Sequence, residues 1–342
     1  MTAFTRRRFA ALSAVGAAGL ALTACGGSDD AAGGTDGAAS DAGGAEGGAE
    51  SGTVEIEDNH GTQTVQIPPE SVVVTDNSLY ESIEAWGITL SAASRQLMPA
   101  TNSLKEDESI VDLGSHREPD LEAVVAAEPT LILNGGRFGQ YYEDFQRLAP
   151  DATIVEVDPR DDQPYGDELK RGQVAIGQIF GKEAEAEELT TAFDAAVERV
   201  SAAYNGSDTV MAVNVSGGEI GYLAPGAGRT LGWTFDAFDF VPALEVEGSS
   251  DDHQGDDISV EAIADSDPTW ILVMDRDAAI SSDDPSYQPA AEILEASEAL
   301  AGVTAVTEGN IVYMPEDTYT NESIQTFTEY FEALADAFEA KA

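Results

Sequence analysis

Two arginines, Arg137 and Arg276, occupy the same place in a segment that the sequence contains twice. Guanidinium groups remain charged at physiological pH and bind oxyanions through paired, charge-assisted hydrogen bonds. The chain has only 16 lysines and arginines against 64 aspartates and glutamates. In so acidic a chain, an arginine at a repeated position indicates a specific anion, and we predict that both residues bind one.

The repeat covers residues 121–137 and 260–276, and its two copies align without a gap, with seven of seventeen positions identical. Each copy predicts a short helix, Pro-Thr, an apolar strand, and then the arginine. Ligands of open α/β sheets bind outside the carboxyl ends of the strands, so two facing lobes would direct both arginines into one cleft. Alternatively, the repeat reflects only helix-on-sheet packing, and the arginines pair with acids such as Asp275 or Asp277.

The remaining elements predict an α/β fold in which two similar Rossmann-like lobes are joined by a long backbone helix. A β-hairpin opens an N-terminal lobe over residues 53–181, and strands alternate with helices through a C-terminal lobe over residues 205–342. Residues 182–204 have apolar side chains every three to four positions, which predicts a rigid connecting helix. The ligand cleft is expected between the lobes.

The first 24 residues are predicted to be a signal peptide, with three arginines followed by a short apolar stretch. The twin arginines with Phe9 favour Tat export, although the same n-region would also serve the Sec route. Cys25 is the only cysteine and follows a small residue, so we predict that it is lipidated after cleavage. The apolar stretch is shorter than a membrane span, so the chain would be anchored to the outer face of the cell membrane.

Residues 25–52 contain the predicted lipidated cysteine and an otherwise small and polar linker, which cannot bury enough apolar surface to fold. Cleavage after residue 24 would remove three arginines and no acids, leaving 13 basic residues against 64 acidic ones. Nucleic acid is therefore excluded as a partner. The acidic side chains are interpreted as a solvated surface in preference to a cation-binding one.

Several further segments follow the pattern of a known family. They are residues 114–133 (GSHREPDLEAVVAAEPTLIL), 137–138, 149–150, 228–232, 253–259, 272–276 and 311–315. Together they resemble the class III, helical-backbone substrate-binding proteins of ABC transporters, specifically the ferric-siderophore group that includes enterobactin and petrobactin binders. The similarity covers roughly Thr53 to the C-terminus.

The resemblance implies that Arg137, Arg229 and Arg276 line the cleft and hold an anionic ferric catecholate complex. It also matches His253 with a histidine of that group and brings a tyrosine ligand near Tyr319, so both residues become possible direct Fe(III) ligands. The alternative for His253 is a solvated loop histidine among aspartates. The loop over residues 316–321 is shorter and more polar than the aromatic-rich segment of the family. This departure concerns the match between Tyr319 and the tyrosine ligand of the family.

The resemblance also implies partners in the membrane. Glu122 and Glu261 occupy matching places in the repeat, and one surface glutamate on each lobe of such proteins docks with arginines of the permease. The alternative is that both glutamates simply favour helix N-termini through the macrodipole. The expected assembly is a monomeric binding protein that meets an ABC permease with its cytoplasmic ATPase.

The predicted function is capture of a ferric siderophore, of anionic catecholate or mixed type, for iron uptake, without catalysis or a permanently bound cofactor. The same fold would also suit haem, cobalamin, ferric citrate or a hydroxamate complex, and a sensor or adhesive lipoprotein remains an alternative. Direct Zn²⁺ or Mn²⁺ binding needs more ligands than His60, His116 and His253 provide. The chain contains neither a G-x-S-x-G nor an H-E-x-x-H motif of hydrolases.

Overall fold

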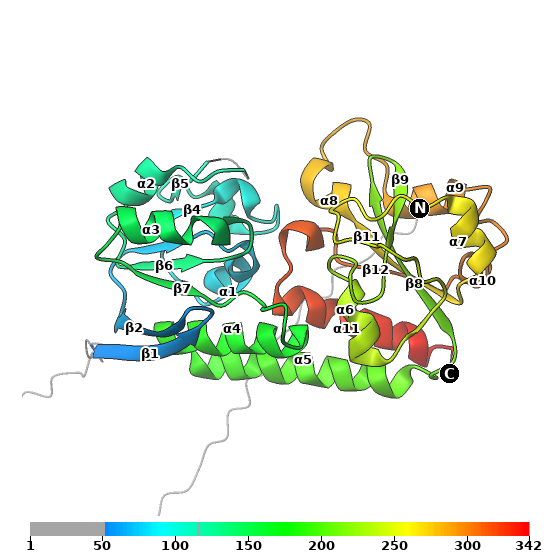
Figure 1. Cartoon of the computed structure of the whole chain (residues 1–342), viewed down its shortest axis with the longest axis horizontal. Helices are drawn as coiled ribbons and strands as arrows, with labels where there is room; N and C mark the ends of the chain where they lie inside the picture. Colours follow the sequence, from blue (N-terminus) through cyan, green and yellow to red (C-terminus); the bar gives the residue numbers. More distant parts are fainter. Residues whose placement is uncertain (1–51, 115–116, 342) are drawn as a thin grey trace, which may run out of the picture. The chain divides into compact units, whose positions relative to one another are not determined.

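Each half of the chain contains a mainly parallel β-sheet (Figure 1). The computed structural model describes residues 52–114 and 117–341. The predicted signal peptide, the predicted lipidation site Cys25 and the predicted linker up to residue 51 lie outside the described residues. Across the described ranges, no helix combines the length and the apolar character needed to span a bilayer.

The N-terminal half begins with the predicted hairpin, in which β1 pairs with β2 around Asn59 and His60. A parallel sheet of order β5-β4-β3-β6-β7 follows. The strands and helices of the N-terminal half are β1 (Gly52–Asp58), β2 (Gly61–Ile67), β3 (Val72–Val74), α1 (Tyr80–Ala85), β4 (Ala92–Ala93), β5 (Val111–Asp112), α2 (Leu121–Ala126), β6 (Leu131–Asn134), α3 (Tyr142–Leu148) and β7 (Thr153–Glu156). Short 3₁₀ turns are η1 (Asn77–Leu79), η2 (Arg95–Leu97), η3 (Ser103–Glu106) and η4 (Gly136–Tyr141).

The C-terminal half has the strand order β10-β8-β11-β12, all parallel, with β9 added antiparallel to β8. Its elements are β8 (Thr209–Ser216), β9 (Glu219–Leu223), α6 (Gly232–Phe238), β10 (Val241–Pro242), α7 (Val260–Ser266), β11 (Trp270–Asp275), α8 (Arg276–Ser281), α9 (Ala290–Ala296), α10 (Thr304–Glu308), β12 (Ile311–Tyr313), η5 (Thr318–Thr320) and α11 (Ile324–Glu339). The predicted α/β class with two similar lobes is confirmed.

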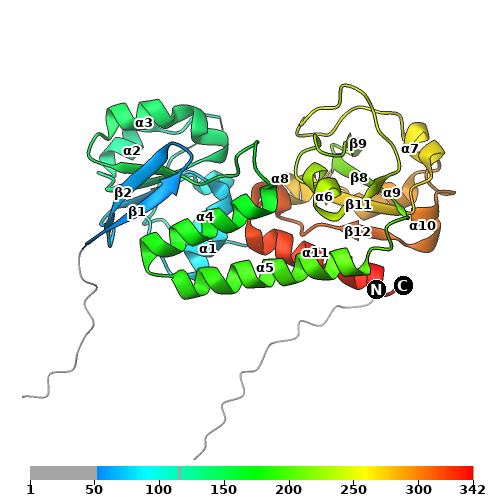
Figure 2. The same cartoon turned by 60° about the horizontal axis from the view of Figure 1, so that its bottom comes forward.

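Two helices join the halves, α4 (Tyr165–Phe180) and α5 (Glu183–Ala203), and Figures 1 and 2 show both running beneath the sheets. Ala186 of α5 packs in the core of the N-terminal half, whereas Phe193 and Val200 of the same helix pack in the core of the C-terminal half. Because one continuous helix contributes to both cores, it couples them mechanically. The helix predicted over residues 182–204 is therefore observed, one residue shorter at each end.

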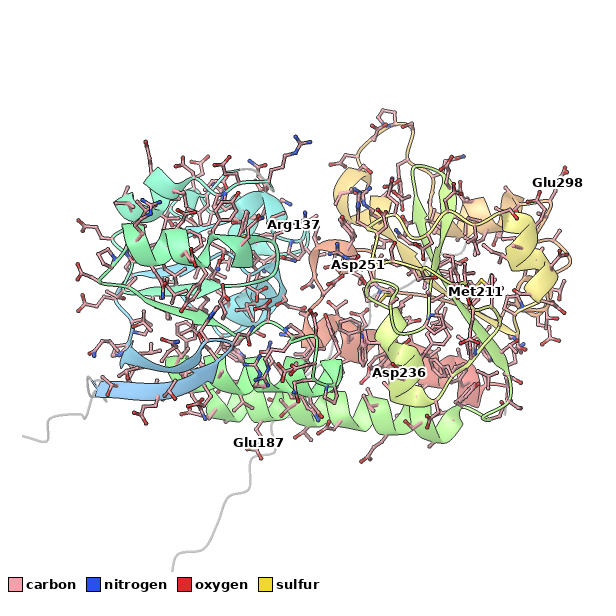
Figure 3. All side chains as sticks on the ribbon, viewed as in Figure 1. Arg137, Glu187, Met211, Asp236, Asp251 and Glu298 are labelled. Atoms are coloured by element: carbon pink, nitrogen blue, oxygen red, sulfur yellow. The ribbon has the colours of Figure 1, made fainter. Side chains whose placement is uncertain are left out.

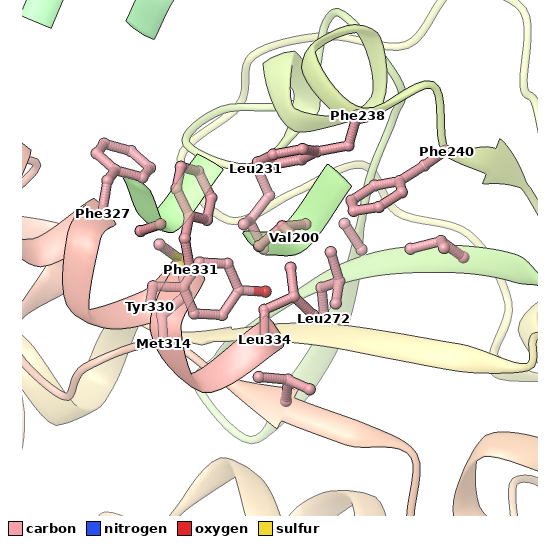
Figure 4. Packing of buried hydrophobic residues seen from close by; sticks show 14 of the residues in the cluster. Val200, Leu231, Phe238, Phe240, Leu272, Met314, Phe327, Tyr330, Phe331 and Leu334 are labelled. Atoms are coloured by element: carbon pink, nitrogen blue, oxygen red, sulfur yellow. The ribbon is translucent and has the colours of Figure 1, made fainter. Parts of the chain in front are cut away.

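Aromatic rings fill much of the C-terminal core (Figure 4). Phe331 of α11 meets Phe238 of α6 edge to face, with ring centroids 5.0 Å apart. Such T-shaped pairs add about 0.5–1.5 kcal/mol beyond the area they bury. The core therefore fixes α11, and with it the residues that immediately precede this helix.

The repeat proves to be a structural unit with matching ends. Asp120 caps α2 by accepting from the backbone N–H groups of Glu122 and Ala123, and Ser259 caps α7 by accepting from that of Ala262. Glu128 and Asp267 both adopt left-handed backbone conformations, with φ of 44° and 42°, where each helix turns into its strand. The two copies thus have the same helix start and the same tight exit.

The Pro-Thr pair of the repeat also has a structural reason. The hydroxyl of Thr130 accepts hydrogen bonds from the backbone N–H groups of Glu70 and Ser71, each at 3.0 Å. Thr269 accepts from the N–H of Thr209 at 3.3 Å in the second copy. Each threonine therefore ties its strand to the start of the neighbouring strand and fixes their register.

Candidate functional site

Arg137 and Arg276, the two repeat arginines, line the same cavity. Arg137 lies in η4, just beyond the carboxyl end of β6, and Arg276 begins α8, directly after β11. The cavity has a volume of about 630 Å³ and takes its walls from both halves of the chain. In Figure 3, Arg137 is labelled on the side of the N-terminal half that faces the C-terminal half.

Tyr319 lies at the centre of the basic residues. This residue is 7% exposed, and the guanidinium carbons of Arg229 and Arg276 lie 5.0 and 4.8 Å from the centroid of its ring. Burial acts to raise the pKa of Tyr319, but hydrogen bonding to Arg276 and Arg137 and the charges of Arg229 and Arg276 outweigh it. The pKa of this phenol is therefore lowered, which favours the phenolate that a metal ion binds.

Arg229 is positioned by a tight loop between β9 and α6. A Cβ on Gly228 would lie 2.5 Å from the backbone nitrogen of Ala224, so this position accepts only glycine without rearrangement. The next turn places Nε of Arg229 at 3.4 Å from Oε1 of Glu322. Burial acts to lower the pKa of Arg229, yet the carboxylate of Glu322 outweighs this and raises it. The arginine remains charged.

The lining of the 630 Å³ cavity contains no aspartate or glutamate among the described residues. It consists of Gln96, Leu97, Met98, Lys105, Arg137, Arg229, His253, Arg276, Ala279, Ile280, Tyr319 and Thr320. Lys105 is a fourth cation that we did not predict, and its ammonium donates to the carbonyl of Met98 at 2.7 Å. A chain with 64 acidic residues thus gathers four of its 16 lysines and arginines around one cavity.

His253 lies at the rim of this cavity. Its side chain is 51% exposed, and its Nδ1 is 3.8 Å from Oδ1 of Asp252. Asn214, near the carboxyl end of β8, donates to the backbone carbonyl of His253 at 3.0 Å and so anchors the loop. The imidazole is accessible to a ligand in the cavity, but its loop contact with Asp252 also fits the solvated alternative.

No cluster of three or more His, Cys, Asp or Glu side chains that could hold a metal ion occurs in residues 52–114 and 117–341. His60, the other described histidine, is engaged elsewhere, with Nε2 at 2.6 Å from Oε2 of Glu156. His253 and Tyr319 are thus the candidate iron ligands that share the cavity. These two side chains would suit a metal ion whose remaining ligands are supplied by a bound chelator.

A second cavity, of about 350 Å³, adjoins the first and has the opposite charge on one wall. Asp76, Asp158 and Glu322 line it, and sequence reasoning missed all three. A signal was present, because Asp76 comes two residues after β3 and Asp158 two residues after β7. Carboxyl ends of parallel strands meet at one edge of a sheet, so these two side chains belong to the same crevice as Arg137.

Glu122 and Glu261, the glutamates matched by the repeat, lie apart from both cavities. Each is exposed and stands in the first turn of its helix, α2 or α7. Their positions are equivalent in the two halves. Both the docking role and the macrodipole alternative are compatible with this geometry.

The sequence profile of the family described as Periplasmic binding protein matches residues 72–318. The chain is 26% identical to the petrobactin-binding protein YclQ of Bacillus subtilis over 290 residues, which cover 82% of this chain and 86% of YclQ. It is 25% identical to the ferric-anguibactin-binding protein FatB of Vibrio anguillarum over 229 residues, or 66% of this chain and 69% of FatB.

A solved structure gives the same fold. The catecholate-siderophore binding protein VctP of Vibrio cholerae superposes with a TM-score of 0.71 at 23% identity, covering 84% of this chain and all of VctP. The fold and the profile together define a two-lobed solute-binding protein of the extracytoplasmic type. The chain belongs to the periplasmic binding protein family.

Proposed function

We propose that this protein captures an anionic ferric siderophore, of catecholate or mixed type, and delivers it to an ABC permease for iron uptake. The single observation that supports this most strongly is the cavity in which Lys105, Arg137, Arg229 and Arg276 meet without a lining carboxylate. A ferric tris-catecholate is a trianion whose ionised oxygens face outward. Guanidinium groups hydrogen-bond such oxygens while remaining charged.

The relatives bind ligands of this kind. YclQ binds petrobactin, FatB binds ferric anguibactin, and VctP binds a catecholate siderophore, as their names state. Haem, cobalamin, ferric citrate or a hydroxamate complex would use the same cleft. A neutral hydroxamate complex leaves the four cations without a partner, so we place it behind an anionic complex.

His253 and Tyr319 would complete the iron coordination when a siderophore supplies only two catecholates. The lowered pKa of Tyr319 supports this role, because the phenolate is the form that ligates Fe(III). With a hexadentate siderophore the same two groups would act as hydrogen-bonding contacts. In both cases iron enters and leaves as part of the cargo, and no resident cofactor or catalytic step is involved.

The remaining assignments concern delivery. Cys25 would carry the lipid anchor after removal of residues 1–24, with residues 25–52 as the tether. Glu122 and Glu261 would dock one on each half of a permease coupled to its cytoplasmic ATPase. The protein would act as a monomer, because one binding protein then presents both glutamates at once.

A fluorescence titration tests the ligand class. Trp86, Trp233 and Trp270 provide the signal, and residues 26–342 would be titrated with a ferric tris-catecholate and, separately, with a neutral ferric hydroxamate. We expect saturable quenching by the catecholate that is strongly weakened by Arg229→Ala. A preference for the hydroxamate would refute the anionic ligand while leaving the family assignment intact.

A further inference from the structure

The cleft is bipolar, because the acidic 350 Å³ cavity shares part of its wall with the basic one. Leu97, Arg137, Arg229, Tyr319 and Thr320 line both cavities. A ligand large enough to occupy the two would meet cations at one end and carboxylates at the other. A purely anionic complex would be repelled by this second end. An anionic ligand therefore does not account for the carboxylates of the acidic wall.

Asp76 is the carboxylate that lacks a partner. Its Oδ1 accepts two hydrogen bonds from Ser78, from the backbone N–H at 3.0 Å and from the hydroxyl at 2.8 Å. Its Oδ2 is buried and has no hydrogen-bond partner in the structure. The residue as a whole is 3% exposed. A buried, unsatisfied carboxylate oxygen is costly to folding unless a ligand satisfies it.

Asp158 lines the same 350 Å³ cavity as Asp76. A Cβ built on Gly135 would lie 2.7 Å from Oδ2 of Asp76 and 3.2 Å from Oδ1 of Asp158. The two oxygens thus flank one glycine, and Oδ1 of Asp158 also accepts a hydrogen bond from Nδ2 of Asn59 at 3.0 Å. Across the cavity, Oε1 of Glu322 accepts from Arg229 and from the hydroxyl of Thr230, at 3.4 and 2.5 Å.

The raised pKa values of Asp76 and Asp158 support a positively charged ligand group beside them. Burial raises the pKa of Asp76 to about 7, and the neighbouring charge of Asp158 adds to the effect. Burial likewise raises the pKa of Asp158, in spite of a hydrogen bond from the N–H of Gly136 and the charge of Arg171. Two carboxylates that resist ionisation side by side would both ionise readily next to a cation.

A ligand ammonium fits these groups better than a metal ion. Among the described residues, no three acids, histidines or cysteines are arranged to hold a metal. An ammonium carries several N–H donors and suits carboxylates spread around a cavity, each accepting one hydrogen bond. It also carries the positive charge that Asp76 lacks.

We propose that Asp76, Asp158 and Glu322 form a subsite for a protonated amine of the ligand, so that the captured siderophore joins its anionic chelating groups through an amine-bearing backbone. This inference rests on the proposed function and narrows it to one substrate class. The arginines hold the chelated iron, and the acidic wall recognises the linker. Siderophores without a cationic group then bind less well, because their negative charge faces uncompensated carboxylates.

Two synthetic ligands that differ in one linker group test the subsite. Both carry two 2,3-dihydroxybenzamide groups, joined in one by a pentane chain and in the other by its 3-aza analogue, whose central amine is protonated at neutral pH. Their ferric complexes would be titrated into the protein by tryptophan fluorescence. We expect the amine ligand to bind roughly tenfold more tightly, as is typical when a desolvated charge pair forms.

Variants locate the effect. Asp76→Asn keeps the acceptor that Ser78 needs and removes the charge, so it should bring the affinity ratio of the two ligands close to one. Asp158→Asn should lower the ratio as well. Asp284→Asn is the matched control, because Asp284 makes the same pair of bonds, to the N–H and hydroxyl of Ser286, on the exposed surface. It should leave the ratio unchanged.

The outcomes separate this inference from the proposed function. If both ferric ligands bind with equal affinity, the siderophore role stands and the amine subsite is refuted. If neither binds, the proposed function fails and the subsite fails with it.

Discussion

The guanidinium carbon of Arg276 lies 4.8 Å from the centre of the Tyr319 ring. This contact joins the second copy of the repeat to the loop that precedes α11. Asp277, which sequence reasoning considered as a neutralising partner, lies 3.4 Å from Nη1 of the same arginine. Arg276 thus contacts both Tyr319 and Asp277. Its contact with Asp277 leaves it in the lining of the cavity.

Arg137→Gln should weaken the binding of an anionic ferric catecholate by at least about tenfold, since one hydrogen bond to a charged group contributes roughly 1.5–3 kcal/mol. Arg137 is exposed, and no ion pair involving it is found within the described residues, so the substitution should leave folding intact. Titration by fluorescence measures the affinity. Arg147→Gln, which removes an exposed arginine paired with Asp144, is the control and should bind normally.

Tyr319→Phe should change the visible spectrum of a bound ferric bis-catecholate but not that of a ferric tris-catecholate. The phenolate would complete the iron shell only when the siderophore leaves coordination positions open. His253→Ala should behave in the same way. Identical charge-transfer bands for native protein and both variants with the bis-catecholate would show that neither side chain ligates iron.

The stability of the unliganded protein should fall as the pH rises from about 4 to about 7, in part because of Asp76. Burial raises its folded-state pKa from 3.8 to about 7, so ionisation is harder in the folded than in the unfolded chain. Asp76→Asn should remove this component and stabilise the protein at pH 8 by on the order of 1–4 kcal/mol. Urea unfolding at pH 5 and pH 8 measures the difference, with Asp284→Asn for comparison.

The pKa of Asp284, the residue changed in the control, is shifted in the opposite direction from that of Asp76. The pKa of Asp284 is lowered by hydrogen bonds from Ser286, so its contribution is present above pH 3.8 and is lost only at lower pH. Asp284→Asn should therefore not change the slope between pH 5 and pH 8. A slope that is equally steep in native protein and Asp76→Asn would contradict the assignment to Asp76.

Charge reversal at Glu122 or Glu261 should leave siderophore affinity unchanged and reduce delivery to the permease. Both residues are exposed and remote from the cavity lining. The measurement is the stimulation of permease-coupled ATP hydrolysis by loaded protein, for Glu122→Arg, Glu261→Arg and both together. Glu143→Arg, which alters an exposed first-turn glutamate of α3, should stimulate normally. Normal stimulation by the double variant would favour the simple helix-terminus explanation.

Thr130→Val should destabilise the N-terminal half by about 1–3 kcal/mol, because the N–H groups of Glu70 and Ser71 lose their acceptor. Thr269→Val should have a smaller effect, since its bond to the N–H of Thr209 is longer, at 3.3 Å. Differential unfolding of the two variants in urea tests the order. Equal losses would indicate that the strands are held mainly by their backbone ladders.

The repeat explains why the fold was predictable. Helix, Pro-Thr, strand and arginine are local signals, and each corresponds to a local feature: caps at Asp120 and Ser259, and left-handed exits at Glu128 and Asp267. Arg137 and Arg276 were found because they occupy the same position in the two copies of the repeat. Asp76 and Asp158 follow strand ends as well, but without the repeat, and sequence reasoning passed over them among 64 acids.

The sequence by itself determined the α/β class, the paired segments, the connecting helix and the two arginines, because periodicity and spacing along the chain encode them. Only the tertiary structure decided which charges share a cavity. Lys105, Arg229 and Tyr319 come from loops far apart in the chain, and Asp76 meets Asp158 only where β3 and β7 end at the same sheet edge. Electrostatic partnership depends on distance and burial, and neither can be read from a list of residues.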